Sequence, residues 1–409
     1  LTIPQNCLRF SDIDNVGYTG RHGTNFVMIG QCAFQKPQDY DQPRYVKDLL
    51  DFFTEVVGVP IDEIQIHEDA WIGGGDCGPS MEFFSRGLEL ANQVYMWFDM
   101  SNAKDISQIK PLNLKVLDMG MGQDRVCWFS QGTLNQYEAT MPKACEYIFE
   151  RSGLKPNWEV YKKFLPYSGM LNLDEAEDVE SVWRDISERV GIDVDMLKRE
   201  VEPVAGVYSI ADHTRSLLYA LADGALPSNV KGGYNLRLIL RRALDFIYKF
   251  NWDVDMYEVM KIHARELEPL YPELKEALES ETSRIKEVIH LEVEKYKKHK
   301  EKVDSKIKSI VGKDKELKTE DFIKYYISDG IMPEEIKESF KKQDKEIEIP
   351  NNFFTLVNEY FDERVQADVE DEKNLLAEFV EDLPATQLLF YEDVHKSEGS
   401  AEILKEFDL

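Results

Sequence analysis

The stretch that decides the fold class is DMGMGQDR, residues 118–125. It follows a β-like run at residues 114–117, alternates two glycines, and leads into a helix that we expect to begin near Arg125. Glycine permits backbone dihedral angles that a Cβ forbids, and it lets a nucleotide approach the main chain closely. The planar guanidinium of Arg125 suits a phosphate or the face of a base. Alone, the pattern fits an ordinary tight strand-to-helix turn equally well, with Asp118 as a helix cap.

The sequence around this turn divides into two regions. Residues 1 to about 145 mix glycines with short β-like runs, of which 26–29 (FVMI) and 93–98 (QVYMWF) are the clearest. Residues 45–57 carry apolar side chains at helical spacing between those strands. From about 146 to 382 the apolar residues recur every three or four positions, which is typical of amphipathic helices. The pattern predicts an α+β region followed by a mainly helical one.

Two segments near the C-terminal end differ from the helical pattern. Residues 282–310 are highly charged with few apolar positions, which indicates an exposed helix or helical arm. Residues 387–391 (QLLFY) are β-like again, and we expect residues 383–409 to open a further domain.

Composition limits the class of protein. The net charge of −28 argues against broad nonspecific binding to nucleic acid, although a local basic strip would suffice for a specific RNA. No apolar run approaches the roughly 20 residues needed to cross a bilayer, and no export signal follows Leu1, so we expect a cytoplasmic protein with no membrane contact. The five cysteines are scattered without a C-x-x-C pair, which fits a reducing compartment and predicts no zinc site.

A second candidate segment lies near the N-terminus. Arg9 ends one β-like run, and Phe26 begins the next after a polar loop that includes Arg21 and His22. This arrangement could clamp ATP, with Arg9 on the α-phosphate and Phe26 stacked on adenine. Taken by themselves, Arg9 is equally a surface charge and Phe26 a core residue.

A third segment is WIGGGDCGPSME, residues 71–82. A glycine-rich loop ending in Glu82 could bring a carboxylate to a magnesium-bound nucleotide, because Mg²⁺ prefers oxygen ligands. It is not a Walker loop, since no Gly-Lys-Ser/Thr follows.

A local basic strip follows Asn229. Positions 229 to 249 contain five basic residues and one acidic residue, an unusual balance in so acidic a chain. If the residues lie on one helix, the strip suits phosphates, and the less favoured alternative is an ordinary solvated helix face. The basic residues are Lys231, Arg237, Arg241, Arg242 and Lys249.

Together, these segments resemble motifs 2 and 3 of class II aminoacyl-tRNA synthetases, in the form found in the archaeal type of the alanyl-tRNA synthetase family. Residues 210–215 (IADHTR), 222–229 (ADGALPSN) and 233–243 resemble that family's tRNA-recognition region and follow in the same order. The resemblance covers nearly the whole chain, and several independent blocks make a chance match improbable.

The resemblance implies a domain plan. Residues 1–145 would be a class II antiparallel-sheet catalytic domain that lacks the N-terminal motif 1 segment, and 146–382 a helical tRNA-recognition domain. Residues 383–409 would begin a linker β-barrel leading to an editing domain. That editing domain and its zinc site would then lie outside this fragment, on a lost segment or a separate chain.

The resemblance also implies roles for matching positions. Arg9, Arg125 and Glu82 would be catalytic, with Glu82 close to Mg²⁺, and Asp118 would pair with the α-ammonium of alanine. The ATP-binding set would be Arg9, Arg21, His22, Phe26, Glu82, Gly122 and Arg125. The alanine pocket would be Trp71, Asn92, Val94, Asp118 and Gly120. The tRNA-binding set would be Asn229, Lys231, Arg237, Arg241, Arg242 and Asp329.

The implied reaction is ATP-dependent activation of L-alanine and its transfer to the 3′ end of tRNA(Ala). One alternative is a paralogue that adenylates a small amino acid for a non-tRNA acceptor, because Ile327 stands where the family has Asp. Another is a noncatalytic tRNA-binding subunit, because motif 1 is absent. Val27 and Trp97 also depart from the family's usual Glu beside the adenine and Gln near the pocket.

Overall fold

The computed structural model divides into two compact units, Leu1–Phe353 and Phe354–Leu409, and the description below concerns the first. The structure describes residues 1–101, 106–172, 178–228, 231–280, 282–312, 317–329, 331, 333–341, 345, 347–350, 353, 356 and 357. The predicted linker barrel at residues 383–409 lies outside the described residues and stays a prediction.

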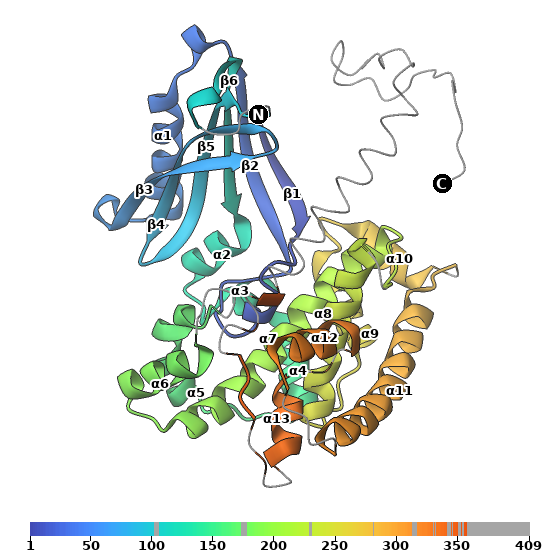
Figure 1. Ribbon diagram of the computed structural model, residues 1–409. Coiled ribbons are helices and arrows are strands. Elements are labelled where there is room, and N and C mark those ends of the chain that lie inside the picture. Colours follow the sequence, from blue (N-terminus) through green and yellow to red (C-terminus); the bar gives the residue numbers. More distant parts are fainter. Residues whose placement is uncertain are drawn as a thin grey trace, which may run out of the picture. The chain divides into compact units, whose positions relative to one another are not determined.

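The N-terminal region is one six-stranded sheet in which every neighbouring pair of strands is antiparallel, in the order β1-β2-β6-β5-β4-β3 (Figure 1). The predicted strands at 26–29, 93–98 and 114–117 fall within β2, β5 and β6, and the predicted α+β class is confirmed. The strands are β1 Thr2–Leu8, β2 Asn25–Gln35, β3 Ile64–Gly73, β4 Asp76–Ser85, β5 Leu88–Asp99 and β6 Lys110–Gly122.

One face of this sheet is covered by a helix. Alternate residues of β6, Leu117, Met119 and Met121, are buried, because they pack with side chains of α1 (Gln42–Asp51) and the π-helical turn Phe52–Val57. We call this the covered face. The residues between them, Asp118 and Gly120 among others, point to the opposite side, because successive side chains of a strand alternate between faces. We call that side the site face.

The glycine-rich segment at residues 71–82 is a β-hairpin, which corrects the predicted loop. Trp71 lies in β3 and Glu82 in β4, and only Gly74 and Gly75 form the turn between the strands. Their φ angles of +60° and +91° explain the error, since a two-residue hairpin turn needs positive φ at both positions and glycine supplies it.

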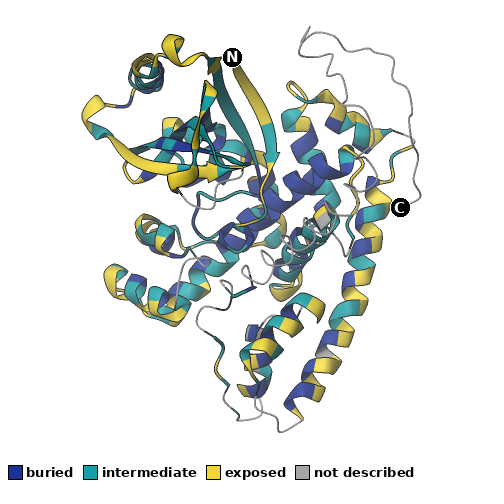
Figure 2. Cartoon of the chain, turned by 45° about the horizontal axis from the view of Figure 1, so that its top comes forward, coloured by how far each residue is buried: buried dark blue, intermediate teal, exposed yellow. Residues whose placement is uncertain are grey.

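The helical region is built around α7, Val194–Ala222. Every residue from Val204 to Leu221 is buried, so that α7 is dark blue along most of its length in Figure 2. A helix buried on all sides is the core of its domain rather than part of a surface layer. The other helices are α2 Gln123–Gln131, α3 Gln136–Thr140, α4 Pro142–Ser152, α5 Trp158–Phe164, α6 Val179–Val190, α8 Lys231–Lys249, α9 Met256–Leu267, α10 Pro272–Glu279, α11 Ile285–Val311, α12 Thr319–Asp329 and α13 Pro333–Lys341.

The charged segment predicted as an exposed arm is α11, and it is amphipathic instead. Ile289, Tyr296, Val303 and Ile310 are buried at intervals of seven residues. This spacing keeps one narrow apolar stripe on the same side of a helix for several turns. Because the remaining positions are highly charged, the overall composition of the segment does not indicate this apolar stripe.

His263 of α9 is buried beneath α7, and its titration should be visible in the stability of the protein. Burial first, then the charge of Arg215, lowers its pKa to about 3 from an ordinary 6.5. Below pH 6.5 His263 therefore binds a proton in the unfolded chain but not in the folded chain. Its contribution to the unfolding free energy is fully present above pH 6.5 and is lost as the pH falls toward 3. The slope from this one group is about 1.4 kcal/mol per pH unit.

We expect His263→Gln to flatten the fall in unfolding free energy between pH 6 and pH 5, measured by urea titration at each pH. The amide nitrogen of glutamine keeps a donor for Ala211 O, which now lies 2.9 Å from His263 Nε2. His290→Gln, at an exposed position of α11, is the matched control and should keep the parent's slope. Equal slopes for the two variants would contradict the assignment.

Candidate active site

The residues predicted to hold alanine share the site face. In the β5–β6 register Asp118 is opposite Val94, and Gly120 is opposite Asn92. In the β4–β5 register Asn92 is opposite Glu82, and directly paired residues of antiparallel strands lie on the same face. Because these positions come from three neighbouring strands, the fold brings them into one patch.

Trp71 joins this patch through the hairpin. In the β3–β4 register His67 is opposite Glu82, and Trp71 lies four residues after His67 on the same strand, so the Trp71 position belongs to the site face. Trp71 itself is opposite Gly78. A Cβ at Gly78 would overlap Tyr95 O, 1.8 Å away, and the strand can therefore approach β5 there only as glycine. The aromatic ring of Trp71 folds back over Gly73.

Asp118 presents its carboxylate at the surface of the site face. Cys32 of β2 is opposite it, and the Cys32 Sγ lies 3.6 Å from Asp118 Oδ1. Burial, followed by the neighbouring Asp118 charge, raises the pKa of the Cys32 thiol, which keeps that side chain neutral. Within the described part of the chain Asp118 makes no ion pair, so the carboxylate is available to a cationic ligand.

Four basic side chains gather at the start of β2 and of α2. The pKa of His22 is lowered to about 4, first by burial and then by the charges of Arg125, Arg21 and Arg9, while the charge of Asp12 acts in the opposite direction. His22 is therefore neutral at pH 7, with its Nδ1 2.7 Å from Thr19 Oγ1. The three guanidinium groups form a local positive site in a strongly acidic chain.

Two carboxylates hold two of these arginines. Arg9 Nε donates to Asp12 Oδ2 at 2.6 Å, and Arg125 Nη1 donates to Glu89 Oε2 at 2.9 Å. Burial, then repulsion from Arg125, lowers the pKa of Arg21, and its buried Nε makes no hydrogen bond to the described residues. Its guanidinium lies against Gly169, where a Cβ would approach Nη2 to 2.7 Å.

A hollow of about 380 Å³ opens beside Arg21 and contains no carboxylate among its described lining residues. Lys162 of α5 adds a second cation to its wall, and Trp128 of α2 adds an aromatic surface. A charged group buried without a partner is costly, so this hollow favours an anion near Arg21.

Glu82 is the carboxylate predicted to meet magnesium. Burial, then the charges of Glu89 and Asp69, raises its pKa, and Asn92 Nδ2 lies 3.5 Å from its Oε1. The described residues hold no group of three or more His, Cys, Asp or Glu side chains that could bind a metal alone. One half-buried carboxylate still fits Mg²⁺ that arrives with a nucleotide, because that ion is usually held by one or two carboxylates and by phosphate oxygens.

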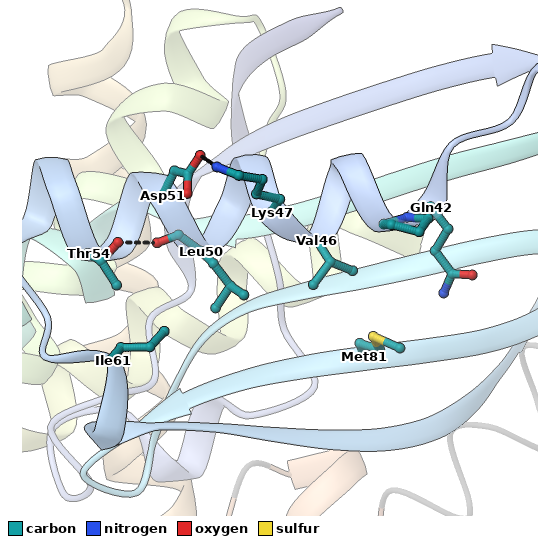
Figure 3. Close-up of a pocket in the computed structure, with 9 residues that line it drawn as sticks. Gln42, Val46, Lys47, Leu50, Asp51, Thr54, Ile61 and Met81 are labelled. Carbon is teal, nitrogen blue, oxygen red and sulfur yellow. Dashed lines mark hydrogen bonds and ion pairs between the residues drawn. The ribbon is translucent and has the colours of Figure 1, made fainter.

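A larger hollow, of about 590 Å³, lies on the other side of the sheet and contains none of the predicted site residues. Figure 3 shows Val46, Leu50 and Thr54 on one wall, with Ile61 and Met81 opposite them. Met81 is paired with Gln93, which is buried on the covered face. The hollow is mostly apolar, unlike the charged patch on the site face.

Two departures from the family pattern lie away from the alanine patch. Trp97 was predicted to be near the pocket, but its ring contacts Tyr40 and Tyr95 on the covered side, with Lys115 Nζ 4.0 Å from the ring centroid. Trp97 therefore packs against the core of the covered face rather than lying on the site face, where we predict the pocket. Val27 uses its backbone N–H to bind Asp124.

The predicted basic strip on α8 is largely committed to the protein itself. Arg237 pairs with Glu292 at 3.0 Å and Arg242 with Asp14 at 2.8 Å, and the arginine side chains are only 14% and 13% exposed. Two of the five strip residues are therefore bound within the fold, while tRNA binding by the strip stays a prediction.

The remaining strip residues differ. Lys249 pairs with Glu202, and Arg241 is half-buried, with its pKa lowered by burial and by neighbouring Arg237. Lys231 and Asp329 lie at the ends of α8 and α12, but their side chains are outside the described part. Asn229 lies outside the described residues, and Ile327 is half-buried in α12.

Sequence reasoning missed a buried polar cluster that joins α7 to the sheet. Asp212 accepts hydrogen bonds from the backbone N–H and the hydroxyl of Thr24, and Arg215 bonds to Asp124. The signal was present in the sequence: two charged residues three apart inside an otherwise apolar helical run. The segment 210–215 was assigned to tRNA recognition instead.

Comparison with known proteins identifies the class of this protein. The chain matches the family described as tRNA synthetases class II (A) over residues 1–408, and it belongs to that family. The antiparallel sheet with its helical partner region is the α+β arrangement expected from the resemblance.

Several alanine–tRNA ligases are among the similar curated relatives. The chain is 40% identical to that of Methanocella arvoryzae over 98% of this chain and 44% of the relative. It is 35% identical to that of Pyrococcus furiosus over 99% and 46%, and 36% identical to that of Nitrosopumilus maritimus over 100% and 44%. The chain therefore spans a little under half the length of the curated relatives it matches.

A comparison with a solved structure carries less information. A solved pyrrolysyl-tRNA synthetase from Desulfitobacterium hafniense aligns with 30% of this chain and 39% of that chain at 16% identity, and its TM-score of 0.22 is too low to support an argument. Among the described residues, none of the helices is both long and apolar enough to span a membrane.

Proposed function

We propose that this chain is the aminoacylation part of an alanine–tRNA ligase, an enzyme that forms AMP and pyrophosphate. The observation that carries the proposal is that one sheet brings together Asp118, a carboxylate with no ion pair to the described residues, and a cluster of three arginines around His22. The relatives named alanine–tRNA ligase support the choice of amino acid.

Alanine would lie on the site face. Asp118 supplies the counter-ion for its ammonium group, and a charge-assisted hydrogen bond of this kind is about twice as strong as a neutral one. Val94 and Trp71 are the apolar neighbours that would contact the methyl group. Gly120 has no side chain to fill this part of the pocket, and a Cβ at this position would lie 3.0 Å from Met28 Sδ. Asn92 supplies the remaining polar contact.

ATP would lie beside alanine, toward the cationic cluster. Phe26 on β2 offers a half-buried ring for adenine, and Gly122 at the start of α2 lets the backbone approach the nucleotide. Arg9, Arg21 and Arg125 would neutralise the triphosphate, and neutral His22 would add a hydrogen bond. Glu82 would hold Mg²⁺, which neutralises phosphate charge when bound.

The chemistry then needs positioning more than covalent catalysis. The carboxylate of alanine attacks the α-phosphorus, pyrophosphate leaves, and the arginines stabilise the charge that develops on the phosphoryl oxygens. A ribose hydroxyl at the 3′ end of tRNA then attacks the carbonyl carbon and AMP leaves. Side chains from the site face orient both reactants.

Alanine-dependent ATP–pyrophosphate exchange by this polypeptide tests the proposal. We expect exchange with alanine and weaker exchange with glycine and serine, because a pocket for one methyl group discriminates by only about 10- to 200-fold. Equal exchange with all three, or exchange with none, would contradict the proposal for this chain.

Recognition of tRNA(Ala) is part of the same proposal, and it assigns different roles to two neighbouring arginines. Arg241→Ala should weaken tRNA binding and lower its salt slope by about one, while alanine activation is kept. Arg242→Ala should instead destabilise the fold by roughly 3–5 kcal/mol, because it leaves the largely buried carboxylate of Asp14 without its partner. Filter binding at several salt concentrations and urea unfolding measure the two effects. A reversed pattern would contradict the assignment.

A further inference from the structure

Phe26 is held through the peptide groups on both sides of it. Arg215 Nη2 donates to Asn25 O at 2.6 Å, which is the carbonyl before Phe26, and to Asp124 Oδ1 at 2.9 Å. The other oxygen of that carboxylate, Asp124 Oδ2, accepts from Val27 N at 2.9 Å, the amide after Phe26. The ion pair therefore fixes the backbone on both sides of the proposed adenine-stacking ring.

The same pair begins the helix that carries Arg125. Asp124 and Arg125 are neighbours in the first turn of α2, and Arg125 is further held by Glu89. Asp124 thus connects the strand of Phe26 to the helix of Arg125. The adenine end and the phosphate end of the proposed ATP site share one anchor.

The anchor is buried and is tied to α7 at two points. The side chains of Arg215 and Asp124 are only 9% and 8% exposed. One turn earlier, Asp212 binds the backbone N–H of Thr24 at 3.0 Å, just before β2 begins. A buried ion pair is often no more stabilising than an apolar pair of the same size, and in some proteins its role is to fix the geometry of the groups that it joins.

We propose that Arg215, acting through Asp124, is a positioning residue for ATP: it sets Phe26 and Arg125 at the separation that a bound nucleotide requires. The inference rests on the proposed function. It is confined to the nucleotide, because Asp118 and Val94 of the alanine patch make no hydrogen bond or ion pair with Arg215 or Asp124 in the described part of the chain.

The test compares the binding of the two substrates in variants of the whole chain. We expect Arg215→Met to raise the Kd for ATP, measured by titration calorimetry, and the KM for ATP in alanine-dependent exchange by about 10- to 100-fold, since hydrogen bonds to charged groups are lost. The KM for alanine should stay at the parent's value. Arg215→Lys should restore part of the ATP affinity, because its single amine can reach one of the two acceptors.

Leu218→Ala is the matched control for a loss of packing. Leu218 is fully buried on α7 one turn beyond Arg215, so truncation lowers the Tm by leaving a cavity, and it should leave the Kd for ATP unchanged. If Arg215→Met does not fold, Asp124→Asn, which keeps the shape and removes the charge, provides the same comparison.

Two results would overturn the inference: folded Arg215 and Asp124 variants with the parent's ATP affinity, or variants in which the KM values for ATP and alanine rise together. A different result would overturn the proposed function alone: a parent chain that binds ATP but shows no alanine-dependent exchange. A parent that does not bind ATP overturns both.

Discussion

Asp118→Asn should lose nearly all alanine-dependent exchange, with kcat/KM for alanine reduced by on the order of 10²- to 10³-fold. The substitution keeps the shape of the side chain and removes the charge that we propose pairs with the ammonium group of alanine. Once substrates cover the site, breaking such a pair costs roughly 3–5 kcal/mol. Exchange kinetics at saturating ATP measure the effect.

Asp99→Asn is the matched control for this substitution. Asp99 ends β5 of the same sheet and accepts hydrogen bonds from Ser101, away from the alanine patch. It should retain the parent's alanine kinetics, and both variants should keep the parent's ATP affinity. An Asp118→Asn chain with the parent's KM and kcat for alanine would remove Asp118 from the pocket.

Arg9→Ala should lower kcat for exchange by about 10²- to 10³-fold, the usual effect of removing one donor that stabilises charge in a transition state. Arg9 is 61% exposed and pairs only locally with Asp12, so its loss should barely change stability. A large kinetic effect with an unchanged Tm would separate its catalytic role from a structural one.

Arg44→Ala gives the comparison that Arg9→Ala needs. Arg44 is similarly exposed on α1, pairs with Asp48 one helical turn away, and lies on the covered side of the sheet. It should retain full exchange activity. Equal activities for the two variants would show that the β1–β2 connection does not bind the α-phosphate.

The sheet could be predicted where the local pattern was strong and could not where glycine obscured it. The apolar β-branched and aromatic runs at 26–29, 93–98 and 114–117 identified three strands. The run of Gly73, Gly74 and Gly75 suggested a loop, because nothing local shows that two positive φ angles form a hairpin turn there. Strand order and register depend on contacts distant in sequence.

The candidate site shows the same limit. The spacing of two between Asp118 and Gly120, and between Asn92 and Val94, already indicates that each pair shares one side of a strand. Only the β5–β6 register shows that both pairs lie on the same face of the sheet. The assignment of roles came from the resemblance rather than from these patterns.

The ion pairs of the basic strip could not be predicted from the sequence for a related reason. A count of charges along α8 cannot include Glu292 and Asp14, which are 55 and 228 residues from the arginines they bind. Both carboxylates cover guanidinium groups that the local sequence leaves unpaired. Arg241 is half-buried, and its contact with tRNA stays a proposal.

The most direct measurement is a crystal structure of this chain with a non-hydrolysable analogue of alanyl-adenylate. The account predicts the ammonium group within hydrogen-bond distance of Asp118, the adenine on Phe26, and the phosphate mimic beside Arg9 and Arg125. An analogue bound on the covered face, or with its ammonium group away from Asp118, would contradict it.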